Sequence, residues 1–335
     1  MSPTSTLSRD PYVKAPPFWR RSASVAGCIF LGAVLLVAAW SKSLDPLAFG
    51  EEVRAQGLDF LLSGEIVALL ALALEYFLGT ALLLAIRRRW VLWPSAALVA
   101  FFVFLTGRTW YLDAKGLLPE AAGCGCFGNL VQRTPAEAFW QDLLLMVPAL
   151  ALAFLTVERG GRPLVRLVLV GLATVAGTAF AWKAPELPLD DFATRLKPGV
   201  EIDQFCAGSS EEGMQVCMNA ILPETQGRHL VVMTDLENKE FLGDMESLNE
   251  LVWSGAGPRL WVLSSAEAEE RFQFQFSHGA TFEVLETPAP LMSPLYRTLP
   301  RSFLMEDGKV LETWSGMPPV KNFLAETETP KTSDQ

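Results

Sequence analysis

Histidine is almost absent from this chain: only His229 and His278 occur among its 335 residues. Neither stands in the spacing of a zinc site or beside the partners of a Ser-His-Asp triad. A basic patch or motif typical of a nucleic-acid surface is also missing. The composition therefore does not favour a zinc enzyme, a triad hydrolase or a protein that binds nucleic acid.

Charge is sparse up to Trp182, where apolar runs dominate the sequence. Five runs are long enough for a helix that crosses a hydrocarbon core, which needs about 20 residues. We place them at 22–41, 66–86, 90–107, 138–157 and 164–182. The first run is too long for the core of a signal peptide and further spans follow it, so we expect it to be retained. The sequence predicts an all-α membrane bundle of five transmembrane helices, embedded in a lipid bilayer.

The basic residues predict the orientation of these helices. The N-terminus, the turn Arg87-Arg88-Arg89 and the turn around Arg159 and Arg162 are rich in basic residues, whereas the two intervening loops also carry several acids. Since basic loops stay on the cytoplasmic side, the N-terminus is expected in the cytoplasm. An odd number of helices then puts the C-terminus outside. We expect a multi-pass protein of a bacterial inner membrane with a periplasmic or extracellular C-terminal domain.

From Lys183 onward the composition is that of a soluble domain, with 12 basic and 25 acidic residues and a net charge of −13. About 150 residues are enough for one hydrophobic core. The predicted organisation is a cytoplasmic N-terminal tail at 1–21, a transmembrane bundle at 22–182, a linker at 183–204, a periplasmic domain at 205–325 and a disordered tail at 326–335.

A pair of cysteines separated by one glycine is the sharpest chemical feature. It lies in the string Gly123-Cys124-Gly125-Cys126-Phe127-Gly128. A disulfide in so small a ring is expected to be strained and therefore easily reduced, which suits a redox pair. A permanent structural disulfide at this place would close almost no loop and would therefore stabilise the fold little. A metal site would need two more ligands, which Cys206 and Cys217 are placed to supply.

The remaining cysteines divide between the two halves of the chain. Cys206 and Cys217 are eleven residues apart in a polar segment on the expected outer side. They form either a structural disulfide or a second redox pair that exchanges with Cys124 and Cys126. Cys28 lies within the first apolar run and is interpreted as a small packing residue.

Two charged residues near the apolar runs are candidate site residues. Glu75 lies in the middle of the second run, where an ionisable group is costly unless it is paired or neutral. It is expected either to support function, for example by relaying a proton, or to make a structural contact between helices. Lys42 directly follows the first run. It either supports the same site or anchors the helix end at the membrane interface.

These residues together resemble a known family. Ser41-Lys42, Asp45-Pro46, Glu75 with Gly79, and the Cys124-Gly-Cys-Phe-Gly128 string resemble the methylamine-utilisation protein MauE, within the wider DoxX-like group. The resemblance covers roughly residues 22–160. It implies a role in disulfide formation or electron transfer for periplasmic methylamine dehydrogenase. Cys124 and Cys126 would then be the redox pair, with Glu75 and Lys42 in support.

The C-terminal domain alternates predicted strands and helices, which indicates an α/β layer fold. Strands are expected at 229–234, 260–263 and 282–285, helices at 239–254 and 267–277, and a hairpin around Asp307-Gly308. This order resembles the thioredoxin fold, with Pro300 as its cis-proline. Asp235-Leu-Glu-Asn-Lys239 stands where thioredoxins carry Cys-x-x-Cys, so the domain is expected to share the shape and lack the activity.

The leading hypothesis is a membrane thiol–disulfide oxidoreductase that serves a periplasmic client protein with thiols. Its electron acceptor would be a membrane quinone or a second protein, although no quinone-binding motif is recognisable. Because Cys28 is the one cysteine towards the cytoplasmic side, a quinone-linked DsbB-type enzyme fits better than a DsbD-type relay. The alternative is a non-enzymatic membrane anchor or assembly factor whose cysteines are structural.

Overall fold

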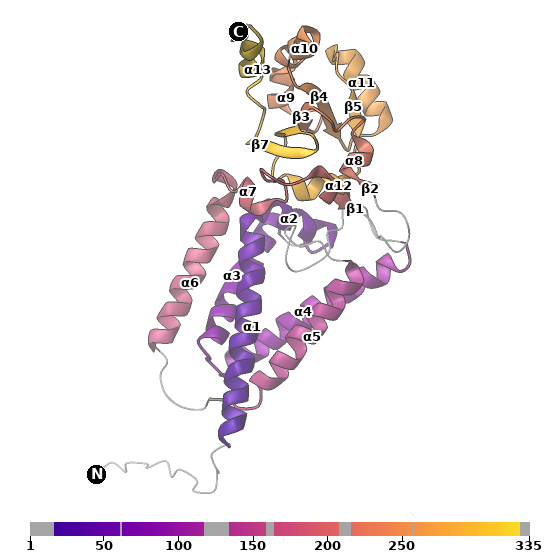
Figure 1. The fold of residues 1–335 in the computed structure, drawn as a ribbon. Helices are drawn as coiled ribbons and strands as arrows, with labels where there is room; N and C mark the ends of the chain where they lie inside the picture. Colours follow the sequence, from indigo (N-terminus) through magenta and orange to yellow (C-terminus); the bar gives the residue numbers. More distant parts are fainter. Residues whose placement is uncertain are drawn as a thin grey trace, which may run out of the picture.

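The computed structural model describes residues 17–60, 62–116, 134–158, 164–207, 216–255 and 257–328 (Figure 1). Within these ranges, a bundle of long helices is joined to a smaller domain that contains a β-sheet. Cys124 and Cys126 belong to the segment 117–133, which lies outside the described residues. The N-terminal residues 1–16 and the C-terminal residues 329–335 also lie outside them.

The five predicted spans are present as five helices long and apolar enough to cross a membrane, counted over the described residues. They are α1 (Phe18–Leu44), α3 (Gly64–Leu83), α4 (Arg89–Asp113), α5 (Pro135–Ala153) and α6 (Leu164–Lys183). Most extend beyond the predicted runs, because helical turns continue into flanking polar residues. The long apolar runs thus located every span, and the helix ends differ from the predicted ends by a few residues.

A short helix that the hydropathy did not indicate follows the first span. This is α2 (Pro46–Ala55), and it begins where the Asp45 side chain accepts a hydrogen bond from the Ala48 backbone N–H. Pro46 occupies the first helical position, where its missing N–H is not needed. The helix α2 packs beside the start of α3, where Arg54 and Glu65 form an exposed ion pair. It covers the end of the bundle that faces the C-terminal domain (Figure 1).

Small residues allow the central helices to approach closely. A side chain at Gly32 would meet the backbone of Gly79 and Leu83, so α1 and α3 pack almost backbone to backbone. Gly177 gives α6 the same closeness to the ring of Tyr76 on α3. Close packing through glycine is typical of membrane helices, because lipid supplies no hydrophobic force between them. In contrast, α4 packs mainly on α5 and touches α3 only sparsely.

The C-terminal part of the chain begins with short helices and turns. The predicted linker 183–204 contains η2 (Ala184–Glu186), α7 (Asp190–Ala193) and η3 (Ile202–Gln204). Two buried arginines attach it to the domain. Arg297 donates hydrogen bonds to the carbonyl oxygens of Ala184 and Leu187, and Arg301 pairs with Asp191. The linker is therefore part of the domain's packing.

The domain contains a mixed five-stranded sheet in the order β5-β4-β3-β6-β7. Its strands are β3 (Arg228–Met233), β4 (Arg259–Ser264), β5 (Val284–Glu286), β6 (Arg301–Glu306) and β7 (Lys309–Ser315). The strands β3, β4 and β5 are parallel, β6 runs antiparallel to β3, and β7 runs antiparallel to β6. Consecutive residues of β3 are buried on opposite faces, which explains its continuous apolar sequence.

Helices and turns cover both faces of the sheet. One face carries α9 (Lys239–Gly243), α10 (Met245–Ser254), α11 (Ala268–His278) and α13 (Val320–Glu328). The other carries α8 (Met218–Ile221), α12 (Ala289–Met292) and η4 (Ser293–Leu295), and Figure 1 shows this face turned towards the bundle. The predicted helix 239–254 is two helices that meet at Asp244. The helix α13 continues to Glu328, three residues into the predicted disordered tail.

The sharpest local predictions for this domain are confirmed. The Leu299–Pro300 peptide bond is cis, and it directly precedes β6. Asp307 and Gly308 form the turn of the β6–β7 hairpin with positive φ angles of 50° and 78°. The parallel β3–β4 pair, the cis-proline and the closing hairpin make this a thioredoxin-like α/β domain. The whole chain is thus a helical membrane bundle plus a soluble thioredoxin-like domain.

Candidate functional site

The two charged candidates of the membrane half meet inside the bundle. Lys42 on α1 donates a hydrogen bond of 2.5 Å from Nζ to Oε1 of Glu75 on α3, and both side chains are almost fully buried. Lys42 therefore does not reach outward to the membrane interface. Glu75 is central in its own helix, yet it lies level with the last turn of α1 because α3 starts beyond the end of α1, beside α2.

Two aromatic rings flank the ammonium group. The Lys42 Nζ lies 4.9 Å from the ring centre of Phe49 on α2 and 4.8 Å from that of Phe102 on α4. Cations are attracted to the faces of aromatic rings, more strongly where water is excluded. The lysine is thus held by a carboxylate on one helix and by rings from two others. Sequence reasoning missed both rings, because nothing in the local pattern links Phe49 and Phe102 to Lys42.

A second polar contact lies next to this pair. The hydroxyl groups of Ser43 on α1 and Tyr76 on α3 are 3.0 Å apart and share a hydrogen bond. Consecutive residues of α1 thus bind consecutive residues of α3. Two adjacent polar contacts between helices hold the side chains of Lys42 and Glu75 in a single arrangement.

The ion pair lies at the wall of an elongated apolar cavity of about 490 Å³. The cavity lies between α2, α3, α4 and the start of α5, where α3 and α4 barely touch. Its apolar lining includes Phe49, Val67, Leu74, Leu98, Phe101 and Leu105. Lining residues on α4 run from Pro94 to Thr109, which is roughly 22 Å along a helix axis.

The cavity opens sideways into the zone where lipid would surround the bundle. Leu74 on α3 and Phe101 on α4 both line it, and both remain about 40% exposed on the bundle surface. An apolar molecule dissolved in a bilayer can therefore enter between α3 and α4 without crossing a polar layer. At the end nearer the soluble domain, α2 closes the space through Phe49 and Val53.

One oxygen of Glu75 is oriented for a further partner. Oε1 accepts from Lys42, whereas Oε2 is buried and has no hydrogen-bond partner among the described residues. A buried polar atom without a partner is costly, by about 1–3 kcal/mol. Glu75 also lines the cavity. A molecule in the cavity with a hydroxyl or carbonyl group would therefore meet both an unused carboxylate oxygen and the lysine ammonium.

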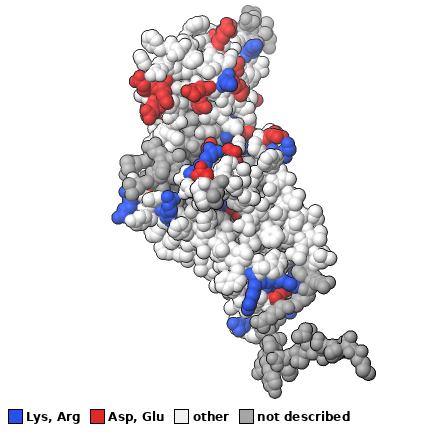
Figure 2. Space-filling model, turned by 180° about the vertical axis from the view of Figure 1, so that it is seen from behind, with Lys and Arg blue, Asp and Glu red and all other residues white. Residues whose placement is uncertain are grey.

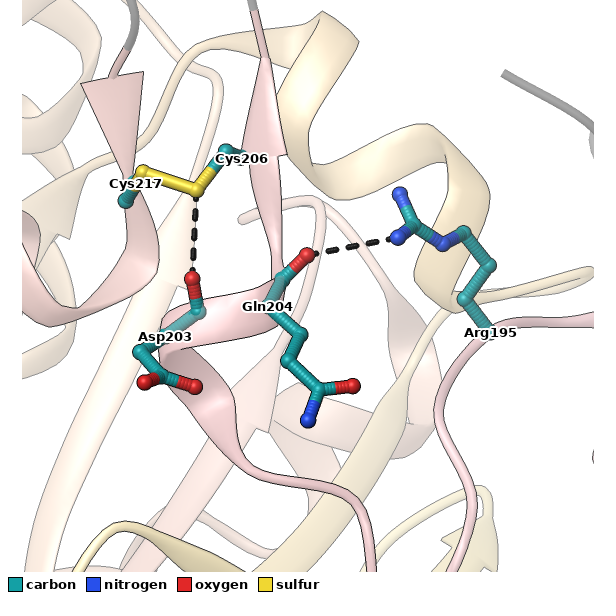
Figure 3. The surroundings of a disulfide bond; sticks show 5 residues. All are labelled: Arg195, Asp203, Gln204, Cys206 and Cys217. Carbon is teal, nitrogen blue, oxygen red and sulfur yellow. Dashed lines mark hydrogen bonds between the residues drawn. A yellow bond between two sulfur atoms is a disulfide. The ribbon is translucent and has the colours of Figure 1, made fainter.

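The cysteines of the soluble domain form a disulfide. Cys206 and Cys217 stand opposite each other on β1 (Cys206–Ala207) and β2 (Val216–Cys217), and their sulfur atoms are bonded (Figure 3). The Cys206 Sγ also lies 3.2 Å from the carbonyl oxygen of Asp203, a contact in which only the reduced thiol has a proton to donate. In this state the two cysteines cannot supply thiolates to a metal.

This disulfide is only partly buried. The strands β1 and β2 that carry it lie at the side of the domain that faces the bundle (Figure 1). The segment containing Cys124 and Cys126 connects α4 to α5, and both helices have this connection at the end nearer the soluble domain. Cys28 is free and fully buried in α1, within the core of the bundle. Its predicted role as a packing residue agrees with that position.

The predicted cis-proline lies in a loop that is bonded to the start of a helix. The Asn238 side chain caps α9 by accepting hydrogen bonds from the backbone N–H groups of Glu240 and Phe241. Its Nδ2 also donates to the carbonyl oxygen of Leu299, the residue before Pro300. Asparagine thus ties together the helix start and the proline loop, where thioredoxins would carry the Cys-x-x-Cys motif. An asparagine after a strand is an ordinary helix cap, so the sequence alone did not reveal this link.

Part of the membrane region matches the model of a known protein family. Residues 20–155 match the family model described as methylamine utilisation protein MauE. This region is therefore similar to the MauE family. The matched range contains α1 to α5 and the Cys-Gly-Cys string, and it ends before α6 and the thioredoxin-like domain. Lys42, Glu75 and the cavity therefore lie within the matched range, whereas the domain that contains the disulfide lies outside it.

The solved structures that resemble the chain cover its C-terminal part. A protein assigned as thiol:disulfide interchange protein DsbE from Chlorobium tepidum is 17% identical, with a TM-score of 0.30, and the match covers 39% of this chain and 94% of that one. A protein assigned as a disulfide isomerase from Bacteroides thetaiotaomicron is 18% identical, with a TM-score of 0.30, and covers 40% and 88%. Such values do not establish a shared activity, and no curated protein matches the sequence.

Proposed function

We propose that this protein is a membrane thiol–disulfide oxidoreductase that forms disulfides in a client protein outside the cytoplasm. The observation that carries the proposal is the Cys206–Cys217 disulfide on the bundle-facing side of the soluble domain. It lies at the end of the MauE-like region where the segment with Cys124 and Cys126 joins α4 and α5. The ends of α4 and α5 that this segment joins lie at the same end of the bundle as the disulfide, which supports a relay between the two cysteine pairs.

The proposed exchange conserves electrons. A thiolate of the reduced Cys206–Cys217 pair attacks the disulfide between Cys124 and Cys126, and a mixed disulfide forms. The second thiolate of the soluble domain then attacks that bond. The domain pair becomes the disulfide seen in the structure, and the bundle pair becomes a dithiol that holds two electrons. A client dithiol reduces the domain pair again and is itself oxidised.

The charge distribution supports an extracytoplasmic place for this chemistry. Basic residues mark the end of the bundle away from the soluble domain, as well as the junction between the two parts, while the middle is uncharged (Figure 2). Basic ends of membrane helices stay in the cytoplasm. The soluble domain would then lie in the periplasm, an oxidising compartment where disulfides persist. As in methylamine utilisation, methylamine dehydrogenase is one candidate client.

The test follows the thiol state of each cysteine. The detergent-purified protein is equilibrated in dithiol buffers of graded potential, and free thiols are tagged with an alkylating reagent that adds mass. We expect Cys124 and Cys126 to pass reversibly between dithiol and disulfide, and a Cys124→Ser variant to trap a mixed disulfide through Cys126. The Cys28→Ala variant is the control, because its buried thiol is expected to take no part.

Two outcomes would contradict the proposal. If Cys124 and Cys126 stay reduced at every potential, no exchanging pair exists in the bundle. If replacing them by serine lowers the amount of folded protein and leaves client oxidation intact, the cysteines are structural. The protein would then act as a membrane anchor or assembly factor.

A further inference from the structure

The cavity between α3 and α4 has the shape of a site for a long apolar molecule. It is about 490 Å³ in volume, extends along some four turns of α4 and opens towards lipid beside Leu74 and Phe101. Cavities of this size and apolar lining are typical of small-molecule sites. A lipid acyl chain alone would fill such a space without needing any polar group.

The polar end of the cavity selects against a bare acyl chain. Lys42 and Glu75 are buried there, and the Glu75 Oε2 has no hydrogen-bond partner among the described residues. Burying this pair in lipid-facing protein costs energy that an apolar ligand does not repay. A ligand whose oxidised form offers a carbonyl acceptor to the ammonium, and whose reduced form offers a hydroxyl donor to the carboxylate, uses both groups in turn. The combination of an apolar tail and such a headgroup describes a membrane quinone and its quinol.

We propose that this cavity binds a membrane quinone with its headgroup against Lys42 and Glu75. The Lys42 Nζ donates a hydrogen bond to a carbonyl oxygen of the quinone, and Glu75 Oε2 accepts from a hydroxyl of the quinol. The inference rests on the proposed function, because the bundle pair needs an acceptor for two electrons. Oxidation of the Cys124 and Cys126 thiols releases two electrons and two protons, and reduction of the quinone to the quinol takes up the same number.

The ion pair would also stabilise the charge that develops on the quinone during its reduction. A quinone oxygen gains negative charge as electrons arrive, and the Lys42 ammonium stabilises that charge at hydrogen-bond distance. The rings of Phe49 and Phe102 exclude water around it, which strengthens the interaction. Glu75 is held by Lys42 through one oxygen only, so the other remains available to the quinol proton.

The experiment measures binding of decylubiquinone to the full-length protein in nanodiscs made from quinone-free lipid. Retained quinone is quantified by chromatography after washing. In Ala71→Phe a ring enters the cavity from α3, one turn before Glu75, and this change should weaken binding roughly tenfold or more. Ala100→Phe is the matched control, because Ala100 is exposed on α4 and outside the lining. Its binding should equal that of the unchanged protein.

A second variant tests the headgroup contacts. Lys42→Met with Glu75→Leu removes both charges of the pair together, so it is expected to fold. It should bind decylubiquinone roughly tenfold more weakly, since the charge-assisted hydrogen bond from the Lys42 Nζ to the quinone carbonyl is lost. Folding of each variant is checked by its elution profile in size-exclusion chromatography.

The outcomes separate this inference from the proposed function. Equal binding in Ala71→Phe and Ala100→Phe, or a cavity that retains only phospholipid, overturns the quinone site. Binding that persists in a Cys124→Ser/Cys126→Ser variant supports the site, since the cavity residues themselves are unchanged. If quinone binds but never oxidises Cys124 and Cys126, the thiol function fails while the binding site stands.

Discussion

At the scale of single residues, Lys42 and Glu75 show how far a sequence pattern can lead. Each of the two residues was recognisable in the sequence as unusual, because charged residues are rare in apolar runs. Their partnership was not, since 33 residues separate them and helix rotation decides which side chains face each other. The two rings around the lysine, the neighbouring Ser43–Tyr76 contact and the cavity depend on the same rotation.

Asp45 makes a prediction that depends on pH. Partial burial raises the pKa of its carboxyl from 3.8 to about 6, against the opposing effects of the Ala48 hydrogen bond and Arg297. The folded protein then binds a proton more tightly than the unfolded chain. Stability therefore falls as pH rises through the window from about 4 to 6, and the loss persists at neutral pH.

The Asp45→Asn variant removes this penalty and keeps a side chain that caps α2 equally well. At pH 7 we expect it to be more stable than the unchanged protein by roughly 1–2 kcal/mol, with the difference vanishing below about pH 4. Thermal unfolding followed by intrinsic fluorescence at several pH values measures the difference. Asp113→Asn, which removes an exposed carboxylate, controls for the loss of one negative charge. A difference that does not change with pH would contradict the prediction.

At the scale of elements, the bundle depends on the close approach of α1 and α3. A Cβ added at Gly32 would lie 2.5 Å from the Leu83 backbone nitrogen and 2.7 Å from the Gly79 carbonyl oxygen. Backbone atoms cannot move aside as a flexible side chain does. The contact therefore fixes the separation of the two helices that carry Lys42 and Glu75.

Gly32→Val is expected to force α1 and α3 apart and to lower stability by roughly 1–3 kcal/mol or more. The measurement is the temperature at which detergent-solubilised protein loses its monodisperse elution peak. Gly171→Val provides the control, because a side chain at Gly171 on α6 meets no atom within 4 Å. If both variants lose the peak at the same temperature, the close approach is not what stabilises the bundle.

The soluble domain shows which elements local pattern predicts well. Strands β3, β4 and β6 and the Asp307-Gly308 turn were located within a few residues, because apolar runs and turn chemistry are local signals. The prediction of a single helix at 239–254 was wrong in one respect, because the helix is interrupted at Asp244. The short strands β1 and β2 were missed, since they are two residues long and are held together by a disulfide.

At the scale of the whole molecule, the chain joins two units at one end of the bundle. Arg297 and Arg301 of the soluble domain bond to residues of the linker. The linker is therefore packed against the domain. The disulfide of this domain, the cap formed by α2 and the start of α5 all lie at that end (Figure 1). This arrangement places the domain's disulfide on the side that faces the bundle.

Membrane orientation is the prediction at this scale. Basic residues at the end of the bundle away from the soluble domain predict a periplasmic domain. Alkaline phosphatase fused after Gln335 should therefore be active, because that enzyme needs its disulfides, whereas a green fluorescent protein at the same place should stay dark. Fusions after Arg89 are expected to show the reverse. Fluorescent C-terminal fusions would place the domain in the cytoplasm and contradict the proposed oxidising chemistry.

The sequence by itself determined the number of spans, the alternation of strands and helices along the domain, its cis-proline and the absence of a Cys-x-x-Cys motif. These features follow from hydrophobic periodicity, turn residues and motifs, which act over a few residues along the chain. Only the tertiary structure decided that Lys42 meets Glu75, that α3 and α4 leave a cavity beside them and that Cys206 is bonded to Cys217. Contacts between distant segments depend on how helices rotate and pack, and many arrangements share one hydrophobic pattern.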